Sequence, residues 1–239
     1  MKRLILFRFP IFTVISAAKA QAFKVGVVAG IAITDVDGFN PNGNGDDFRK
    51  FGPIIGGSVS TKLGVKSTLQ MEITYTQRGS AWPPDSTNNN NYYRFSLDYI
   101  DVTILWKRQL HLGVNKKPTD KLGFEAGVTL GTLFTYLYTS KSIVYPITGL
   151  NTFDAGVLVG IYYNFSPKFY FSGTYGNSFI PVIPHDGFPA GSYGLFYSSW
   201  NKGENLAFQL TFGLKFGSNS EDKVSNAPVA PPPAPVGGN

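Results

Sequence analysis

Large apolar residues recur at every second position over most of the chain beyond residue 22, and small or polar residues fill the positions between them. In Leu69–Ser80 (LQMEITYTQRGS), the apolar face carries Leu69, Met71, Ile73 and Tyr75, and the other face carries Gln, Glu, Thr and Arg. Because successive strand residues point to opposite faces of a sheet, a period of two indicates β-strands with one apolar face. The pattern predicts eight strands, over residues 23–34, 55–63, 69–80, 93–107, 122–138, 153–165, 169–175 and 206–216.

The apolar faces favour lipid over a protein core. A soluble, lipocalin-like barrel would turn its apolar face inward. Here the polar face is rich in Gly, Ser and Thr, and aromatic residues gather near strand ends, as in the aromatic belts of membrane proteins. No uninterrupted run of apolar residues after the first 20 is long enough for a membrane helix. We therefore predict an all-β fold, an eight-stranded antiparallel up-and-down transmembrane β-barrel.

The connections between the predicted strands alternate in length. Residues 63–66 and 166–168 are tight turns, and 111–120 is a longer turn on the same side; the long connections are 35–51, 79–92, 139–151 and 177–203. Short periplasmic turns and long extracellular loops are typical of outer-membrane barrels, and an even number of strands places both termini in the periplasm. The alternation slips near Asp98 and Tyr99, which predicts either a bulge or the rim of the strand there. Tyr136 and Tyr138 are predicted to face lipid with the rest of their strand.

The two ends of the chain differ in composition from the predicted barrel of residues 21–218. Residues 1–20 have a basic start, an apolar middle and small residues near Ala18 and Ala20, which predicts a signal peptide, with an uncleaved interfacial helix as the alternative. Residues 219–239 end in NAPVAPPPAPVGGN, which predicts a disordered, proline-rich periplasmic tail, either inert or docked on a partner.

Charge and cysteine content narrow the function classes. The net charge of +6 includes four cations and no acid in residues 1–20, so the remainder carries +2 and does not indicate nucleic-acid binding. The chain has no cysteine, which excludes disulfides, thiolate metal sites and a cysteine nucleophile, and two histidines make a structural zinc site a poor fit. We predict neither cofactor nor metal nor catalytic residue.

Charged residues fall on the inward phase of the predicted strands. An eight-stranded barrel is just wide enough for its own side chains, so such charges form either a paired, hydrogen-bonded plug or a proton or ion path. The predicted network in the lumen consists of Lys24, Lys62, Glu72, Arg78, Asp101, Lys107, Glu125, Asp154 and Lys215.

The last long loop is the most distinctive one, with FIPVIPHDGFPAGSYGLFYSSW at residues 179–200. Its aromatic residues either anchor a partner or a glycan, or fold over the barrel mouth. The candidate contact residues are Phe179, His185, Phe188, Tyr193, Phe196, Tyr197 and Trp200. The alternative of an outer-membrane enzyme would use His185 with Ser192, Ser198 or Ser199.

Two segments resemble the PorT-like outer-membrane β-barrel family of Bacteroidota. Leu69-Gln70-Met71-Glu72 followed by Tyr75-Thr76-Gln77-Arg78-Gly79, and then Leu97–Val102, are similar to the family's LQxExxYxQKG … LxYLEIPLLxK hairpin; Thr103 stands where the family often has proline. The first strand, Val25-Gly26-Val27 to Gly30, and the closing Phe212–Phe216 also fit.

The resemblance implies an eight-stranded barrel in the bacterial outer membrane, and some members are accessory components of type 9 secretion and gliding machinery. We expect a non-enzymatic subunit of a larger outer-membrane complex that contacts lipid and other outer-membrane or periplasmic proteins through its loops and tail. The alternative is a narrow pore or a receptor mouth built by residues 177–203. Fold alone does not decide between them.

Overall fold

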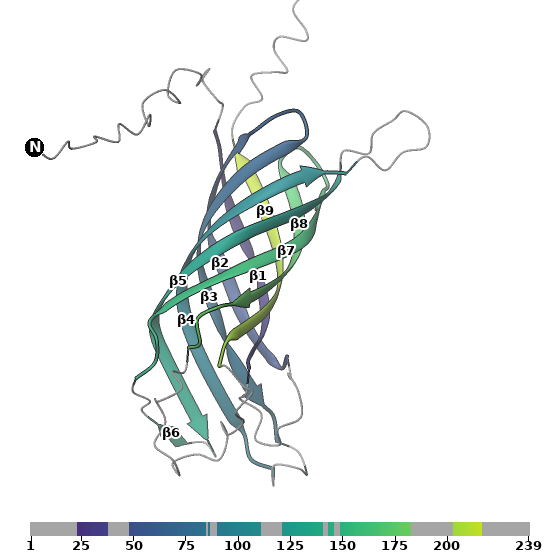
Figure 1. Cartoon of the computed structure of the whole chain (residues 1–239). Helices are drawn as coiled ribbons and strands as arrows, with labels where there is room; N and C mark the ends of the chain where they lie inside the picture. Colours follow the sequence, from purple (N-terminus) through teal and green to yellow (C-terminus); the bar gives the residue numbers. More distant parts are fainter. Residues whose placement is uncertain are drawn as a thin grey trace, which may run out of the picture. The chain divides into compact units, whose positions relative to one another are not determined.

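The computed structural model describes residues 23–37, 48–84, 86, 90–110, 121–140, 143–145, 149–182 and 203–216. Eight antiparallel strands form a closed ring, because β4 pairs with both β3 and β5, and the predicted barrel is confirmed (Figure 1). The strands are β1 Lys24–Val36, β2 Lys50–Lys62, β3 Ser67–Trp82, β4 Tyr93–Gln109, β5 Leu122–Ser140, β7 Phe153–Asn164, β8 Phe169–Ser178 and β9 Asn205–Phe216. The predicted signal peptide and tail lie outside the described residues.

One short strand was not predicted. This strand, β6, covers Ile143–Tyr145 and pairs only with the last three residues of β5. Among the described residues, no helix is both long and apolar enough to cross a membrane.

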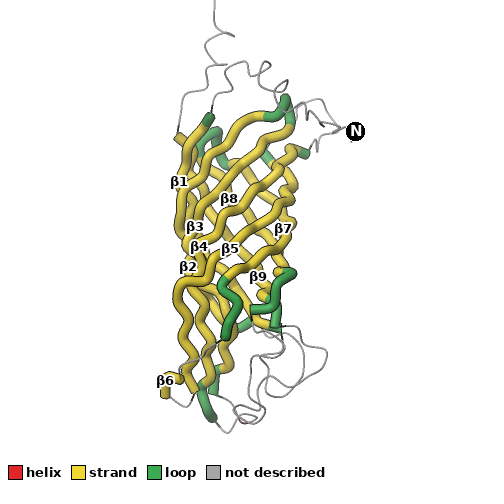
Figure 2. Tube along the Cα trace, turned by 60° about the vertical axis from the view of Figure 1, so that its left-hand side comes forward, coloured by secondary structure: helices red, strands yellow, loops and turns green. Residues whose placement is uncertain are grey.

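The strands are strongly staggered around the ring. A row of paired residues that starts at Phe153 of β7 and passes through every strand returns to β7 at Tyr163, ten residues further along. A stagger of this kind makes the strands tilt around the barrel axis, as Figure 2 shows. The resulting interior is just wide enough for side chains to fill it.

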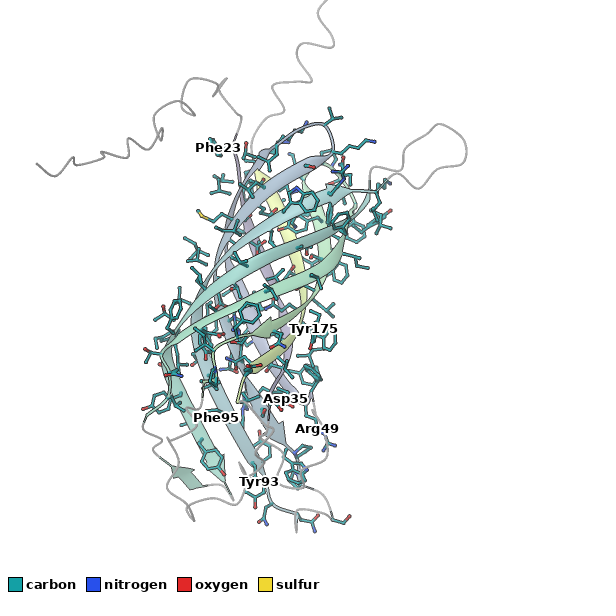
Figure 3. The ribbon with its side chains drawn as sticks, in the orientation of Figure 1. Phe23, Asp35, Arg49, Tyr93, Phe95 and Tyr175 are labelled. Atoms are coloured by element: carbon teal, nitrogen blue, oxygen red, sulfur yellow. The ribbon has the colours of Figure 1, made fainter. Side chains whose placement is uncertain are left out.

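The barrel has two different ends. The turn end carries the tight turns at residues 63–66 and 165–168, the start of β1 and the end of β9, where Val25 pairs with Phe216. The loop end carries the start of β4 and the end of β5, where Tyr93 pairs with Ser140. Figure 3 shows Phe23 near the turn end and Tyr93 near the loop end.

The predicted alternation sets the two faces of the barrel wall. Exposed apolar side chains occupy the outward positions of every strand in the ring, for example Val25, Ile55, Ile73, Val102, Val128, Val159, Phe169 and Phe212. Inward positions hold buried small polar residues such as Ser58, Thr74, Thr103 and Ser172. The hydrophobic surface is thus on the outside, as membrane barrels require.

Within the described strands, the alternation reverses at a bulge in β5, and one prediction was wrong because of it. The β4–β5 register shifts at Asp98 and Tyr99, where the sequence predicts a bulge. The extra residue, however, is Phe134 of β5, because Asp98 pairs with Thr135 and Tyr99 with Leu133. Beyond this bulge the faces of β5 exchange, so Tyr138 is 2% exposed and buried in the interior instead of facing lipid.

Strand ends differ most from the prediction at the loop end. β2 begins at Lys50 rather than at residue 55, although Gly52 and Pro53 interrupt the apolar pattern. Pro53 is tolerated because it lies just beyond Ile54, the last residue of β2 that pairs with β3. β3, β4 and β5 extend to 16, 17 and 19 residues, which makes one side of the wall taller than the other.

Candidate functional site

The lumen contains a buried ion-pair cluster nearer the loop end, centred on Arg78. Its two terminal nitrogens lie 2.6 Å from Asp101 Oδ2 and 2.5 Å from Asp154 Oδ2. Asp101 comes from the neighbouring strand β4, and Asp154 comes from β7 on another part of the ring. The guanidinium also lies 4.8 Å from the centre of the Tyr99 ring. One cation thereby joins three strands, β3, β4 and β7, across the interior.

Neutral side chains complete this cluster. Asn205 Nδ2 donates a hydrogen bond of 3.1 Å to the Tyr99 hydroxyl, and the Ser178 hydroxyl donates to Asp154. Asn205 belongs to β9 and Ser178 to β8, so side chains from five of the eight strands of the ring contribute to the cluster. Burying charges is costly unless they are paired and hydrogen-bonded, and this arrangement supplies both.

A second cluster lies nearer the turn end, around the ring of Tyr170. Lys107 Nζ is 2.8 Å from Glu125 Oε2 and 4.2 Å from the centre of the Tyr170 ring. Lys215 Nζ lies 4.7 Å from the same ring. Gln70 Nε2 donates to the Tyr170 hydroxyl at 2.8 Å and to Glu72 Oε1 at 2.5 Å. Tyr170 therefore fills the centre of the lumen between cations and carboxylates.

A small space separates the two clusters. It is lined mainly by threonines, together with acidic and basic residues of both clusters: Thr74, Thr76, Thr103, Thr174, Thr211, Glu72, Asp101, Lys107 and Glu125. The cavity is about 20 Å³, which is room for about one or two water molecules. The interior is thus a packed polar core with a small polar cavity between two ion-pair layers.

An apolar plug fills the loop end of the barrel. It consists of buried residues around Tyr99: Val36, Phe95, Leu97, Leu133, Tyr138 and Val182. Val182 enters from the segment after β8, and its backbone is fixed by hydrogen bonds from Asn151 N (2.9 Å) and to Gly203 O (2.8 Å). The plug therefore covers the Arg78 cluster from the loop side.

Most of the nine predicted lumen charges face inward. Arg78, Asp101, Lys107, Glu125 and Asp154 are buried, whereas Lys24, Glu72 and Lys215 are half-buried. Lys62 shares the inward phase of Ser58 and Ser60 but is exposed, because it is the last residue of β2, beside the tight turn, and its place in the network stays a prediction. Glu72 and Arg78 do not pair with each other and belong to different clusters.

The predicted contact loop lies mostly outside the described residues. Phe179 is described and is exposed, and the two residues that follow it lead to Val182 of the apolar plug. The start of this segment therefore contributes to closing the mouth. The other six candidates, His185, Phe188, Tyr193, Phe196, Tyr197 and Trp200, are not described, nor are Ser192, Ser198 and Ser199.

Sequence reasoning missed the aromatic and amide residues that hold the charges. Tyr99, Tyr162, Tyr170 and Asn205 were not predicted to line the lumen, and Gln70 was expected to face inward but was not included in the network. The period-two alternation alone could have identified Tyr162 and Tyr170 as inward-facing, because each lies between two outward-facing aromatic or apolar residues. Among the described residues, no group of three or more His, Asp or Glu is placed to hold a metal ion.

Comparison with known families identifies the family to which the chain belongs. A family model described as "Outer membrane protein beta-barrel domain" matches residues 17–183. The chain belongs to this family. It is therefore an outer-membrane protein, and its exposed apolar belt is the surface that contacts lipid. A search of curated proteins returned no match.

Solved structures similar to the chain are outer-membrane proteins of several bacteria. Neisserial surface protein A is 13% identical, with a TM-score of 0.44, covering 81% of this chain and 97% of its own. OprG from Pseudomonas aeruginosa is 10% identical, with a TM-score of 0.40, covering 83% and 98%. Ail of Yersinia pestis, in complex with the heparin analogue sucrose octasulfate, is 10% identical, with a TM-score of 0.39, covering 81% and 97%. Likenesses this distant say nothing about ligands of this chain.

Proposed function

We propose that this outer-membrane barrel is a non-enzymatic, non-conducting subunit that serves a structural or accessory role in a larger outer-membrane complex. The observation that carries the proposal is the closed lumen. Two ion-pair layers, Tyr170 between cations, and an apolar plug leave a cavity of about 20 Å³. A barrel filled in this way acts through its outer surfaces, and the packed interior argues against the alternative of a narrow pore.

The tall side of the wall supplies a surface for a partner. A tilted strand crosses the hydrocarbon layer with about 9–11 residues, whereas β3, β4 and β5 have 16, 17 and 19. Beyond the Phe134 bulge, Leu137 lies on the outward phase of β5, and its side chain is exposed. Exposed apolar residues beyond the lipid-covered belt are a common sign of a protein contact.

We place the turn end, with the start of β1 and the end of β9, in the periplasm. Tight turns on this side support that orientation, as does the even number of strands in the ring. The hairpin Leu69–Val102 supports assignment to the PorT-like branch of Bacteroidota, with a role in type 9 secretion or a related assembly. In this account, residues 1–20 direct export, and the loops and the proline-rich tail contact other outer-membrane or periplasmic proteins.

Purification from native membranes tests the complex. The full chain, extracted in a mild detergent, is expected to retain a partner in a fixed ratio. The substitution Leu137→Asp should lower that ratio at least about tenfold, because a buried unpaired charge opposes association. Lys168→Asp, on an exposed turn at the opposite end, is the matched control. A wild-type chain that purifies alone would contradict the proposal.

A further inference from the structure

A polar cluster interrupts the outward face of the wall near the loop end. This rim cluster consists of Lys50, Gln77, Arg94 and Asp98, from strands β2, β3 and β4. Lys50 Nζ donates to Gln77 Oε1 at 2.9 Å, and Arg94 Nη2 donates to the same oxygen at 3.4 Å. Two cations thus converge on one neutral amide oxygen.

The charges of the rim cluster are not balanced. Its only carboxylate, Asp98, accepts hydrogen bonds at one oxygen from the Tyr75 hydroxyl (3.0 Å) and from Gln77 Nε2 (2.9 Å). Among the described residues, neither Lys50 nor Arg94 forms an ion pair. Lys50 is buried and hydrogen-bonds to a neutral amide, and Asp98 is the one cluster carboxylate whose charge attracts it, while Arg94 repels it, so two cations share one carboxylate. The cluster therefore has the composition of an anion site, with one positive charge in excess.

The rim cluster lies where the lipid-facing surface ends. Gln77 pairs with Asp98 one outward position beyond the pair of Tyr75 with Ile100, which belongs to the apolar belt. The ring of Tyr75 contacts that of Phe134, with centroids 6.1 Å apart. Phe51, directly after Lys50, is exposed. Figure 3 shows Arg49, directly before Lys50, in the half of the barrel toward the loop end.

We propose that the rim cluster binds the phosphate group of a membrane lipid whose acyl chains lie on the apolar belt below it. Lipid headgroups lie at the level where aromatic and basic residues end a membrane-spanning surface. Arg94 is half-buried and presents the planar donor group that binds phosphate through two hydrogen bonds. Lys50 adds a second charge behind Gln77, and Gln77 and Asp98 hold the cations in place.

Native mass spectrometry of the full folded chain in detergent micelles tests this site. The probes are phosphorylated lipid A, the same lipid after enzymatic removal of its phosphate, and inorganic phosphate. The wild-type chain is expected to retain phosphorylated lipid A at least tenfold better than the dephosphorylated form. Lys50→Gln/Arg94→Gln should reduce retention to that of the dephosphorylated lipid. Lys121→Gln/Lys168→Gln, which removes two exposed cations outside the rim cluster, should leave retention unchanged.

A second variant keeps both cations and separates a loss of binding from a loss of folding. Gln77→Glu places a carboxylate at their common acceptor, so it should abolish the preference for phosphate while the unboiled protein keeps its folded electrophoretic mobility. Equal retention of both lipids by the wild-type chain, or full retention by Gln77→Glu, would overturn the proposal. Complete displacement of lipid by millimolar inorganic phosphate would overturn the assignment to a lipid.

Discussion

Arg78 shows how single residues close this barrel. Its guanidinium meets two carboxylates from different strands and an aromatic ring, so one side chain replaces several contacts across the lumen. The inward phase of Arg78, Asp101 and Asp154 could be read from the alternating sequence. Their pairing could not, because it depends on the stagger of ten residues around the ring, which no local pattern encodes.

Loss of this cation should destabilise the fold strongly. In Arg78→Gln, Asp101 and Asp154 remain buried without a counter-charge, which should lower the free energy of unfolding by about 3–5 kcal/mol. Urea unfolding in phospholipid vesicles, followed by tryptophan fluorescence, measures the change. The triple variant Arg78→Gln/Asp101→Asn/Asp154→Asn should recover most of the loss. An Arg78→Gln chain as stable as Lys168→Gln would show that the cluster is dispensable.

Within the elements, glycine and aromatic residues on neighbouring strands fit into each other. A Cβ at Gly213 of β9 would lie 1.9 Å from the ring of Tyr170 in β8, to which Gly213 is paired. The alternation predicts that both residues face inward, but not that the ring occupies the space beside the paired glycine. The same holds for β5, where the sequence indicates a slip in the alternation but not which strand carries the extra residue.

A methyl group at Gly213 should therefore displace Tyr170 and weaken the Gln70 and Glu72 contacts. Gly213→Ala is expected to cost about 1–3 kcal/mol by overpacking, measured by the same unfolding assay. Gly173→Ala is the matched control on β8, because its new Cβ would meet only Leu210 at an ordinary 3.6 Å. Equal stabilities for the two variants would mean that Tyr170 does not occupy this position.

The reversal of faces at Phe134 can be read by cysteine labelling, since the chain has no cysteine of its own. Before the bulge, Val128→Cys should react with a membrane-permeant maleimide faster than Thr129→Cys. Beyond it, Leu137→Cys should react at least about tenfold faster than Tyr138→Cys, because Leu137 is 45% exposed and Tyr138 is 2% exposed. Faster labelling at Tyr138→Cys would mean that the faces of β5 do not exchange at Phe134 and that the alternation continues as the sequence predicts.

At the scale of the whole barrel, the sequence predicted the architecture well and the state of the interior incompletely. Eight strands, the direction of their faces and the short turns follow from periodicity and turn residues. Whether the inward charges form a plug or a path depends on how side chains from strands far apart in sequence fit together. Tyr170, the threonine-lined cavity and the apolar plug are the observations that support the closed lumen we propose.

Conductance in planar lipid bilayers tests the closed lumen most directly. The wild-type chain, reconstituted in folded form, should show no discrete current steps at moderate voltage. Tyr170→Ala, which removes the ring from the centre of the lumen, serves as the comparison in which leakage is expected. Steady unitary steps from the wild-type chain that disappear in Glu72→Gln would contradict the account and establish a conducting path through the barrel.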